Sequence, residues 1–461
     1  MSTICPLCGR PKDPKKMYCE YCEYVLCEIC NQNLSRGYCA VCGKLICDND
    51  SIMVGYARVC KECLKINPNL GDPHYLKEYI ETKRRFLPKT TKKLVKIYRK
   101  RGYLPLEDHV YLHVGLDDID SPYGMCTTYV GAVLFEKLLS FGRPMDYPLL
   151  VRLNPNIPMK TRGNAAVALR FKIPRNALNN VKREVLNTIE KHSHTFFPKT
   201  QPSVTIYVTP EYRIHNILFE IYEQAVHDIL PTRMVLEELD KLDYGEIEIY
   251  AQENKKIRGI TGSVAAIGAV FKDYTYELIA YRSPERLSQP RKIDISSVRE
   301  MDQKFRMFTF DNISDGRLLI APTGPDPVLF GIRGDYPEKL LDAFKIIKHE
   351  PISKWCIFRT NQGTHEHVLA IKDINDARPF QTIKYIGKVV KIMQKKEKTI
   401  IHTSCQDFNI ENYTYKIQKK LRKVASLLMR NDKVTIIGNV VERKNKNLKI
   451  NVEEIIIIKL F

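Results

Sequence analysis

The chain has 461 residues, enough for several domains, and carries 73 lysines and arginines against 53 aspartates and glutamates, a formal net charge of +20. This excess favours a polyanionic partner, nucleic acid first, over a merely basic soluble protein. No apolar run reaches the roughly 18 residues that a membrane helix needs, and the N-terminus opens into cysteines instead of a signal peptide, so we expect a cytoplasmic protein without a membrane span.

Cysteines are concentrated at the start of the chain, where 11 of the 14 lie before residue 64. In a reducing compartment such cysteines are more often zinc ligands than disulfides, and a thiol-rich segment without metal is the alternative. The pairs Cys5-x2-Cys8 and Cys19-x2-Cys22 have the spacing of a zinc ribbon, which we expect over residues 1–24. Closed sites with four ligands leave no open position, so the expected role of this metal is structural.

The spacing of the next four pairs resembles the cross-braced FYVE and RING zinc modules, and we expect such a module over residues 25–66. The pairs are Cys27-x2-Cys30, Cys39-x2-Cys42, Cys47-x2-Asp50 and Cys60-x2-Cys63. In those families alternate pairs share a metal. The resemblance therefore implies one zinc site of Cys27, Cys30, Cys47 and Asp50, and another of Cys39, Cys42, Cys60 and Cys63. Asp50 is a carboxylate where the pattern has cysteine or histidine, so its site is expected to hold zinc less well or to be empty.

A basic run follows the zinc modules. Ten lysines and arginines, and no acid, occur from Lys83 to Arg101. We expect a basic helical linker over residues 67–107, with a helix that begins soon after Pro88. The absence of acids favours contact with phosphates over the alternative of a solvated charged face.

An acidic turn is the most informative stretch of the chain. The apolar run Val110–Gly115 predicts a strand, and Tyr129–Leu139 has the length and spacing of a helix. Between them stand three aspartates and a threonine pair: Asp117, Asp118, Asp120, Thr127 and Thr128. The N–H groups at a helix start can meet phosphate, and Mg²⁺ takes a few carboxylates together with substrate phosphates. The sequence therefore predicts a magnesium–phosphate site, with a polar loop of helix-capping aspartates as the alternative.

Later stretches offer further candidates. Lys160, Arg162, Gly163 and Asn164 follow an irregular loop; the glycine permits close approach and the cations neutralise charge, so they predict a phosphate clamp, with an ordinary basic turn as the alternative. Arg333 stands before a glycine in another loop and is a further candidate cation. The small residues of 262–268 let a helix approach a sheet or a ligand closely, and close packing alone is the favoured interpretation.

The remaining pattern predicts a multidomain α+β fold. Helices and strands alternate over residues 258–360, which is typical of a ferredoxin-like sandwich. After Thr382 four predicted strands and one helix, Glu411–Leu428, indicate a C-terminal OB-fold β-barrel. Its lysines and arginines suit single-stranded nucleic acid, and Tyr413 and Tyr415 are candidates for stacking on bases or for core packing.

Six stretches, in this order along the chain, resemble the archaeal TiaS family, the 2-agmatinylcytidine synthetases. They are GLDDIDSPYGMCTTY, LVRLNPNIPMKTRGNAAV, RGITGSVAAIG, TYELIAYR, GPDPVLFGIRGD and TNQGT. The resemblance implies a kinase-like ATP-binding domain over residues 108–250, a ferredoxin-like domain over 251–378 and a tRNA-binding OB-fold over 379–461. It implies ATP-driven attachment of agmatine to C2 of the wobble cytidine in the minor, AUA-reading isoleucine tRNA, with AMP and phosphate as products. By motif position, the threonine that the family phosphorylates corresponds to Thr127.

The implied reaction gives the candidate residues their roles. The C2 oxygen of cytosine is a poor leaving group, and phosphorylation makes phosphate the group that the amine displaces. Such transfer needs positioning and charge neutralisation, so the three aspartates would hold Mg²⁺ on ATP, and the lysine and arginines would clamp the phosphates. Agmatine is dicationic, so its pocket is expected to contain an acid, with Asp302 and Asp326 as candidates.

The chain departs from the family pattern at three places. Ile119 replaces a threonine, which removes a possible hydroxyl contact but keeps the acids, and His365 stands where the family has an acid after TNQGT. The family's zinc ribbon usually follows the OB-fold, whereas here the cysteines come first. Two other functions stay open: a non-catalytic zinc-containing RNA-binding protein, and an ATP-dependent RNA-modifying enzyme that uses a different amine.

Overall fold

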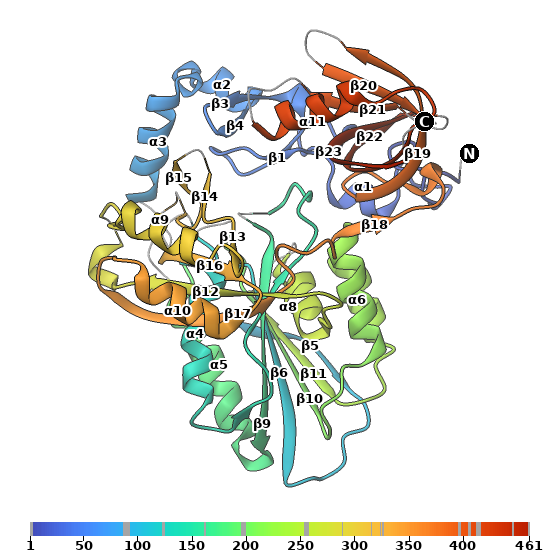
Figure 1. The fold of residues 1–461 in the computed structure, drawn as a ribbon. Coiled ribbons are helices and arrows are strands. Elements are labelled where there is room, and N and C mark those ends of the chain that lie inside the picture. Colours follow the sequence, from blue (N-terminus) through green and yellow to red (C-terminus); the bar gives the residue numbers. More distant parts are fainter. Residues whose placement is uncertain are drawn as a thin grey trace.

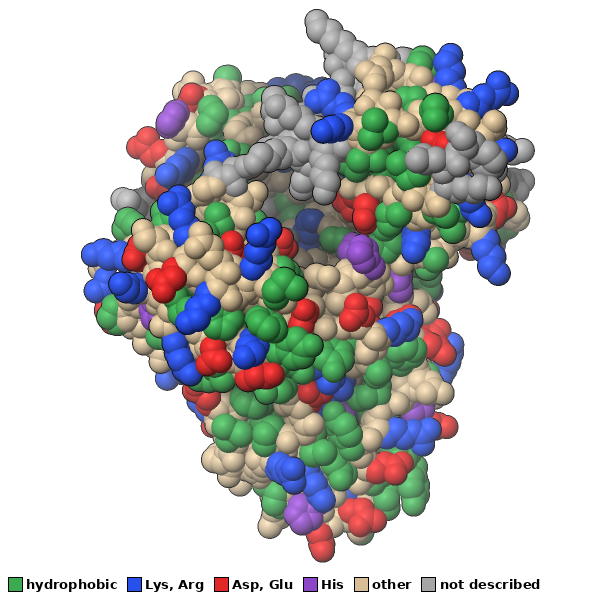
Figure 2. All heavy atoms as spheres, viewed as in Figure 1, with side chains coloured by type: hydrophobic (Ala, Val, Ile, Leu, Met, Phe, Trp, Pro, Cys, Tyr) green, Lys and Arg blue, Asp and Glu red, His purple; other side chains and the backbone are tan. Residues whose placement is uncertain are grey.

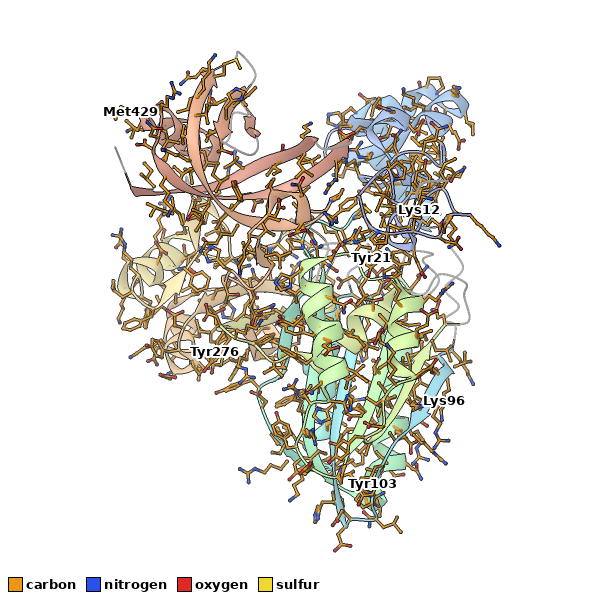
Figure 3. All side chains as sticks on the ribbon, turned by 90° about the vertical axis from the view of Figure 1, so that its right-hand side faces the viewer. Lys12, Tyr21, Lys96, Tyr103, Tyr276 and Met429 are labelled. Atoms are coloured by element: carbon orange, nitrogen blue, oxygen red, sulfur yellow. The ribbon has the colours of Figure 1, made fainter. Side chains whose placement is uncertain are left out.

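The elements of the computed structural model form an upper and a lower layer (Figure 1). The structure describes residues 3–85, 93–121, 125–160, 163–194, 200–252, 258–287, 289–314, 316–322, 324, 327–394, 398–403, 407–411, 416–444 and 447–459. The lower layer is a large sheet flanked by helices. The cysteine-rich N-terminal part and the C-terminal strands lie side by side above it (Figure 3), and a hollow separates the two layers on one face (Figure 2). The fold is multidomain α+β, as the sequence predicts.

The N-terminal part consists of short elements. They are α1 (Glu20–Tyr24), β1 (Gly37–Tyr38), β2 (Leu45–Ile46), η1 (Asp48–Asp50), β3 (Ser51–Val54), β4 (Ala57–Cys60), α2 (Lys61–Ile66), η2 (Pro68–Gly71) and α3 (Pro73–Arg85). Strand β1 pairs with β2 and β3 with β4, both antiparallel. Buried cysteines make up much of the two small cores of this part, together with a few apolar side chains such as Ile46 and Val59. So small a core calls for an additional constraint such as a structural metal.

The expectation of a helix soon after Pro88 is wrong for the described part of the linker. Residues Val95–Arg101 form strand β5, which pairs antiparallel with β11 (Glu246–Ala251). The helical elements of the described linker, η2 and α3, both precede Pro88, and residues 86–92 lie outside the described residues. Ile97 and Tyr98 pack against the core of the lower layer. The cations are tolerated because an edge strand is commonly charged, and Lys96 and Arg99 pair with Glu248 and Glu246 of β11. Composition misled the prediction because lysine and arginine are good helix formers.

Within the described residues, the lower layer is one eleven-stranded sheet. The order runs β13-β16-β12-β17-β8-β9-β6-β10-β11-β5, with β7 beside β9. The other bounds are β6 (His109–Asp117), β7 (Arg143–Pro144), β8 (Leu149–Arg152), β9 (Ala165–Pro174), β10 (Ser203–Thr209), β12 (Thr275–Arg282), β13 (Thr309–Phe310), β16 (Val328–Gly334) and β17 (Ile352–Thr360). Strand β17 pairs with β8 in parallel, with Arg359 opposite Leu149 and Thr360 opposite Leu150. This pairing joins the two halves into one continuous sheet.

Helices cover both faces of the first half of the sheet. They are α4 (Thr127–Leu138), α5 (Leu178–His192), α6 (Asn216–His227), α7 (Thr232–Leu239) and α8 (Gly259–Gly268). Alternate residues of β6, such as Leu112 and Leu116, pack with α4 and α5 on one face. The other face, with Gly115 and Asp117, is covered by α8. A Cβ on Gly115 would lie 1.9 Å from the carbonyl oxygen of Ser263, so the small residues do pack this helix against the sheet.

The second half of the sheet belongs to a βαββαβ unit. Its strands β12, β13, β16 and β17 follow one another in sequence, with α9 (Ile295–Lys304) after β12 and α10 (Pro337–Ile346) after β16. In space they stand in the order β17-β12-β16-β13, and all are antiparallel neighbours. The hairpin of β14 (Ile313–Ser314) and β15 (Arg317–Leu318) is an insertion before β16. Short 3₁₀ turns are η3 (Arg175–Ala177), η4 (Pro284–Arg286) and η5 (Ile374–Asp376).

The C-terminal part is a separate sheet with one helix. Its elements are β18 (Val368–Ala370), β19 (Thr382–Gln394), β20 (Lys398–Thr403), β21 (Asp407–Glu411), α11 (Lys416–Leu427), β22 (Lys433–Lys444) and β23 (Asn447–Lys459). The pairings run from β19 through β20, β21, β23 and β22 and return to β19, and the only pair between β21 and β23 in the described residues is Asn409 with Asn451. Tyr413 and Tyr415 lie outside the described residues. No helix in the described ranges is long and apolar enough to cross a membrane.

Candidate active site and metal-ligand clusters

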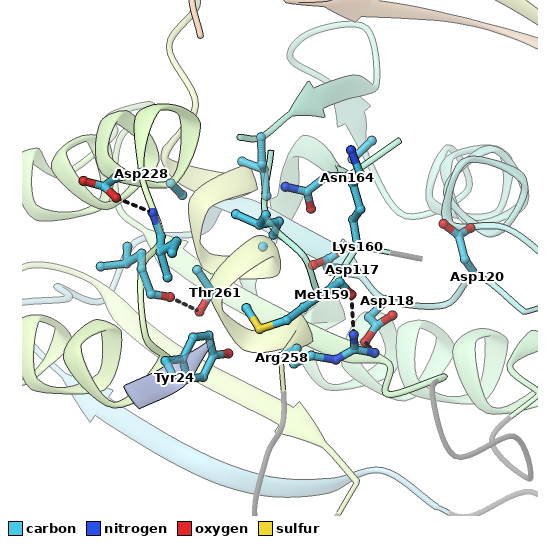
Figure 4. A pocket seen from close by; sticks show the side chains of 17 residues that line it. Tyr24, Asp117, Asp118, Asp120, Met159, Lys160, Asn164, Asp228, Arg258 and Thr261 are labelled. Carbon is cyan, nitrogen blue, oxygen red and sulfur yellow. Dashed lines mark hydrogen bonds and ion pairs between the residues drawn. The ribbon is translucent and has the colours of Figure 1, made fainter. Parts of the chain in front are cut away.

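The three aspartates of the acidic turn line one cavity (Figure 4). Asp117 ends strand β6, and Asp118 follows with φ 55°, a left-handed conformation that aspartate adopts more readily than most residues. Asp120 Oδ1 accepts a hydrogen bond of 3.0 Å from the backbone N–H of Thr127, the first residue of α4. Asp120 therefore caps the start of a helix, as the polar-loop interpretation predicts. All three aspartates also line the cavity, as the magnesium–phosphate interpretation predicts.

Helix α8 approaches the acidic turn closely and helps to bury it. A Cβ on Gly262 would lie 1.9 Å from Oδ2 of Asp117, so this contact requires glycine. Burial, together with the charges of Asp118 and Asp120, raises the pKa of Asp117 well above its usual range. Burial also raises the pKa of Asp118 to about 7, although the guanidinium of Arg258 opposes this shift. A bound cation would stabilise the charged form of these carboxylates, so the residues fit the expected Mg²⁺.

Cations reach the same cavity from two other segments. Arg258, the residue before α8, donates a hydrogen bond of 3.0 Å to Oδ2 of Asp118. Lys160 and Asn164, two of the candidates for phosphate binding, also line the cavity, and burial lowers the pKa of Lys160. Arg162 lies outside the described residues. Sequence reasoning missed Arg258, although it stands at the start of one of the family-like stretches.

Acids outnumber cations around this first cavity, which encloses about 700 Å³ including its open mouth. Asp228, at the end of α6, is a fourth acid of its lining, but it forms an ion pair with Arg10 of the N-terminal part. Arg258 pairs with Asp118, and Lys160 is the other cation of the lining, where its ammonium group donates to the carbonyl of Pro155. Apolar side chains complete the walls: Leu153, Ile157, Met159, Ile229 and Leu230. An acidic, partly apolar cavity of this kind suits a cationic ligand.

A second cavity shares Asp120 and Ala165 with the first. Its lining includes four candidates from the sequence, Thr127, Thr128, Gly163 and Arg333, and two residues that sequence reasoning missed, Arg152 and Glu277. Thr127 is 3% exposed, and its Oγ1 has no hydrogen-bond partner among the described residues. A buried hydroxyl of this kind is available to a ligand that enters the cavity.

Two arginines face one acid in the second cavity. Arg333 Nε donates to Glu277 Oε1 at 3.3 Å, and Arg152 Nη2 lies 3.7 Å from Glu277 Oε2. Glu277 is 5% exposed, so a single buried carboxylate leaves the pair of guanidinium groups with an excess of positive charge. Guanidinium groups bind phosphate well. The three residues come from β8, β12 and β16, far apart in sequence, which is why no local motif indicated the cluster.

Of the two agmatine candidates, the structure describes only Asp302, and this residue does not line either cavity. Asp302 lies on α9, where its Oδ1 accepts a hydrogen bond of 2.9 Å from the Asn312 side chain, and it is not among the lining residues. Asp326 lies outside the described residues. His365, which replaces a family acid, has a side chain that is 72% exposed and lies 3.6 Å from Glu454 of the C-terminal part.

The structure brings the N-terminal cysteines into the groups that their spacing predicts. The groups are Cys5, Cys8, Cys19 and Cys22; Cys39, Cys42, Cys60 and Cys63; and Cys27, Cys30, Cys47 and Asp50. Within each, one ligand atom per residue lies within 4.8 Å of the others. The Sγ atoms of Cys39 and Cys63 are 3.9 Å apart and those of Cys42 and Cys60 are 3.8 Å apart. Four thiolates about 2.3 Å from a tetrahedral zinc lie about 3.8 Å apart, so the side chains fit zinc.

Each group combines a tight turn with the start of a helical segment. The residue after the first cysteine pair has a positive φ: Gly9 (75°), Asn31 (53°) and Gly43 (82°). Its backbone N–H donates to the carbonyl of the first cysteine at 2.8 to 2.9 Å. The second pair begins just before α1, η1 or α2. In the third group, Asp50 Oδ2 lies 3.2 Å from Sγ of Cys27 and 3.1 Å from Sγ of Cys47.

Comparison with protein families matches two segments of the lower layer. Residues 113–177 match the TiaS TCKD domain, and residues 258–367 match the TiaS FLD domain. These segments contribute the acidic turn, Lys160, Arg258, Glu277 and Arg333. Both cavities are therefore lined in large part by residues of the matched segments.

Curated relatives match about three quarters of the chain. The isoleucine-tRNA 2-agmatinylcytidine synthetase TiaS of Pyrococcus horikoshii is 39% identical over 360 residues, which is 76% of this chain and 81% of the relative. The enzyme of the same name from Thermococcus sibiricus is 37% identical over 355 residues, 76% of this chain and 80% of the relative.

Solved structures agree with these relatives. The crystal structure of TiaS in complex with isoleucine tRNA and ATP is similar with a TM-score of 0.66 and 31% identity, and it covers 76% of this chain and 82% of its own. The crystal structure of TiaS with isoleucine tRNA, AMPCPP and agmatine gives a TM-score of 0.65 and 29% identity over 76% of this chain and 84% of its own.

Proposed function

The chain belongs to the TiaS family, and we propose on this premise that it is an ATP-dependent ligase that attaches agmatine to C2 of the wobble cytidine in the minor isoleucine tRNA. Its partners are this tRNA, ATP and agmatine. The observation that carries the proposal is the position of Asp120 in the lining of both cavities, which places an acidic cavity and a guanidinium-rich cavity side by side at one turn. A cytoplasmic location is part of the proposal, because the tRNA substrate is found there.

The second cavity is the proposed phosphate side of the site. Arg152 and Arg333 would neutralise phosphate oxygens, while the glycine at Gly163 and the start of α4 allow close approach of the backbone. The buried hydroxyl of Thr127 is the proposed phosphoacceptor, because it faces this cavity without a hydrogen-bond partner among the described residues. Arg162, which precedes Gly163 in the sequence, is also proposed to bind phosphate.

The first cavity is the proposed cation side. Asp117, Asp118 and Asp120 would hold Mg²⁺, which neutralises charge on the phosphates when bound. Lys160 and Asn164 line this cavity and would contact the phosphate groups that such a cation carries. Agmatine is also cationic, so we propose that its amine approaches from this acidic side. The candidate Asp302 is not among the residues that line either cavity, and Asp326 lies outside the described residues.

The residue ranges of the chain are assigned to domains as follows. We assign residues 108–250 to a kinase-like domain and 251–378 to a ferredoxin-like domain, and the βαββαβ order with strands arranged β17-β12-β16-β13 supports the second assignment. We assign residues 379–461 to a tRNA-binding OB-fold, supported by five paired strands and one late helix. Residues 1–24 and 25–66 would be a zinc ribbon and a cross-braced zinc module, joined to the rest by 67–107. Zn²⁺ in these modules would have a structural role, since each group offers four ligands, which fill a tetrahedral site.

The test is nucleoside analysis by mass spectrometry of isoleucine tRNA incubated with the full chain, ATP, Mg²⁺ and agmatine. The expected result is 2-agmatinylcytidine at the wobble position, with AMP formed in step. A reaction with another amine but not with agmatine would identify a different RNA-modifying ligase. Tight tRNA binding without any ATP consumption would instead identify a non-catalytic RNA-binding protein.

A further inference from the structure

The cysteine-rich N-terminal part, which comprises the proposed zinc ribbon of residues 1–24 and the proposed zinc module of residues 25–66, reaches the candidate active site directly. It lies outside the two segments that match the family domains, residues 113–177 and 258–367. Tyr24 nevertheless belongs to the lining of the first cavity (Figure 4), where its hydroxyl lies 3.3 Å from that of Thr232. Tyr38, on strand β1, hydrogen-bonds the guanidinium group of Arg258. Tyr24 of the ribbon therefore lines the site, and Tyr38 of the zinc module contacts one of the lining residues.

Arg258 is held from three sides. Its Nη2 donates to Asp118 Oδ2 at 3.0 Å, and its Nη1 donates to the carbonyl of Met159 and to the hydroxyl of Tyr38. The guanidinium carbon also lies 5.1 Å from the centre of the Tyr38 ring, within the range of a cation–π contact. The side chain is only 14% exposed. Its geometry against Asp118 therefore depends on Tyr38 as well as on the lower layer.

The position of Tyr38 is fixed by the zinc module. Tyr38 pairs with Leu45 in the two-stranded sheet of β1 and β2 and immediately precedes Cys39, a ligand of the second four-thiol group. A ring that is held at its own backbone can constrain the flexible arginine that it contacts. Arg258 is less suited to position Tyr38, because ordering an arginine side chain costs up to about 2 kcal/mol of conformational entropy.

We propose that Tyr38 of the zinc module is a positioning residue for the reaction: it holds Arg258 in the orientation that sets the carboxylate of Asp118. The inference rests on the proposed function of the acidic turn. The zinc module would then help to position the active site, in addition to any contribution that it makes to RNA binding. The alternative is that the contact between Tyr38 and Arg258 only docks the module on the lower layer.

The test is a double-mutant cycle in the full-length chain, with Tyr38→Phe and Tyr38→Leu each made in the natural chain and in an Arg258→Lys background. Tyr38→Phe keeps the ring and loses the hydroxyl, so kcat for tRNA modification is expected to fall about fivefold, whereas Tyr38→Leu loses both contacts and is expected to lower kcat about 30-fold. The KM for tRNA is expected to stay within twofold of its natural value. In the Arg258→Lys background, Tyr38→Leu is expected to have little further effect, because Tyr38 acts through the guanidinium.

The matched control is Tyr56→Phe, a change in the same module at a fully exposed tyrosine, which is expected to leave all parameters unchanged. Zinc content and melting temperature identify any variant whose module has come apart. Natural kcat in the Tyr38→Leu protein would overturn the proposal, and so would equal losses in both backgrounds or a loss confined to the KM for tRNA. Calorimetric Mg–ATP binding by the same variants needs no turnover. If the natural chain modifies no tRNA, the proposed function fails. The positioning role is then decided by whether Tyr38→Leu weakens Mg–ATP binding only when Arg258 is present.

Discussion

Two clusters of carboxylates in the lower layer are both buried, and their acids titrate in opposite directions. On β11, Glu248 accepts hydrogen bonds from Lys96 at 2.5 Å, Lys182 at 2.7 Å and the Tyr250 hydroxyl at 2.8 Å. Burial works against its charge, but these partners lower the pKa of Glu248 to about 2. In the acidic turn, burial raises the pKa of Asp118 to about 7 and that of Asp117 well above its usual range.

The difference lies in the number of cations supplied by the chain itself. The Glu248 cluster is neutralised by lysines on two elements, β5 and α5, and Lys96 marks its place on the edge of the sheet in Figure 3. The acidic turn has Arg258 on one of its three aspartates, so a proton or a bound cation must offset the remaining negative charge. A saturated cluster stabilises the fold, whereas an unsaturated one stores unfavourable charge where a ligand binds, which is common at functional sites.

The largest expected effect comes from Asp118→Asn. Asparagine also adopts positive φ readily, and the amide is nearly isosteric, so the fold should be kept. Loss of the ion pair with Arg258 is offset by relief of the repulsion from Asp117 and Asp120, so the stability should change little. Loss of one carboxylate at the proposed Mg²⁺ site is expected to lower tRNA modification about a thousandfold, equivalent to about 4 kcal/mol of transition-state stabilisation. Nucleoside analysis and thermal unfolding of the same preparation measure both quantities. Full modification by the variant would refute the metal role of this turn.

The matched change in the saturated cluster is Glu248→Gln, which is expected to behave in the opposite way. It leaves Lys182 beside a neutral partner, so the free energy of unfolding should fall by about 3 kcal/mol, while activity per folded molecule should not change. Denaturant unfolding at pH 7 measures the loss. Glu246→Gln, at a more exposed position of the same strand, should cost less. An inactive but fully stable Glu248→Gln protein would contradict the division between the two clusters.

The pH dependence of stability provides a smaller effect. A carboxylate whose folded pKa is lowered contributes stability that is complete above its unfolded pKa of about 4.5 and is lost as pH falls toward about 2. Protonation of Glu248 should therefore remove about 2 kcal/mol between pH 6 and pH 3. Unfolding curves of the natural chain and of Glu248→Gln at several pH values should converge as pH falls. Parallel curves down to pH 3 would show that Glu248 is not the group responsible.

The smallest expected effect concerns Asp50, a carboxylate among thiols. Two groups have four thiols and one has three thiols with Asp50, so we expect two tightly held zinc ions per chain and a third that is held less well. Asp50→Cys should tighten the third site by about tenfold, or about 1.4 kcal/mol. Metal analysis after graded exposure to a chelator measures the order of loss. Fewer than two ions per chain, in protein purified without added zinc, would contradict the zinc assignment.

Short sequence motifs predicted the features that depend on residues close together in the chain. Cysteine spacing indicated which thiols come together, and the acidic turn was found from a strand, three aspartates and a helix start. What the sequence did not indicate depends on contacts between distant segments. Glu277 and Arg152 meet only because β8 and β12 lie close in the sheet, and Arg258 meets Asp118 only because α8 packs on β6.

The basic run shows a different limit. Its cations favour a helix by intrinsic propensity, and pairing with β11 at the edge of a sheet overrides that preference for Val95–Arg101. The sequence also did not indicate that Tyr24 lines the first cavity or that Tyr38 contacts Arg258. Tyrosines near zinc ligands have no pattern that distinguishes a core residue from one that reaches another domain.

The parallel pairing of β17 with β8 has a consequence for synthesis of the protein on the ribosome. Leu149 and its partner Arg359 are separated by 359 − 149 = 210 positions. At about 5 to 20 residues per second, strand β8 emerges roughly 10 to 40 s before the strand that covers its edge. During that interval the edge of a nascent, apolar sheet is open to pairing with other chains. Production of the enzyme is therefore expected to depend on chaperone capacity, and slow translation should lower the yield of soluble protein more than it does for proteins with local topology.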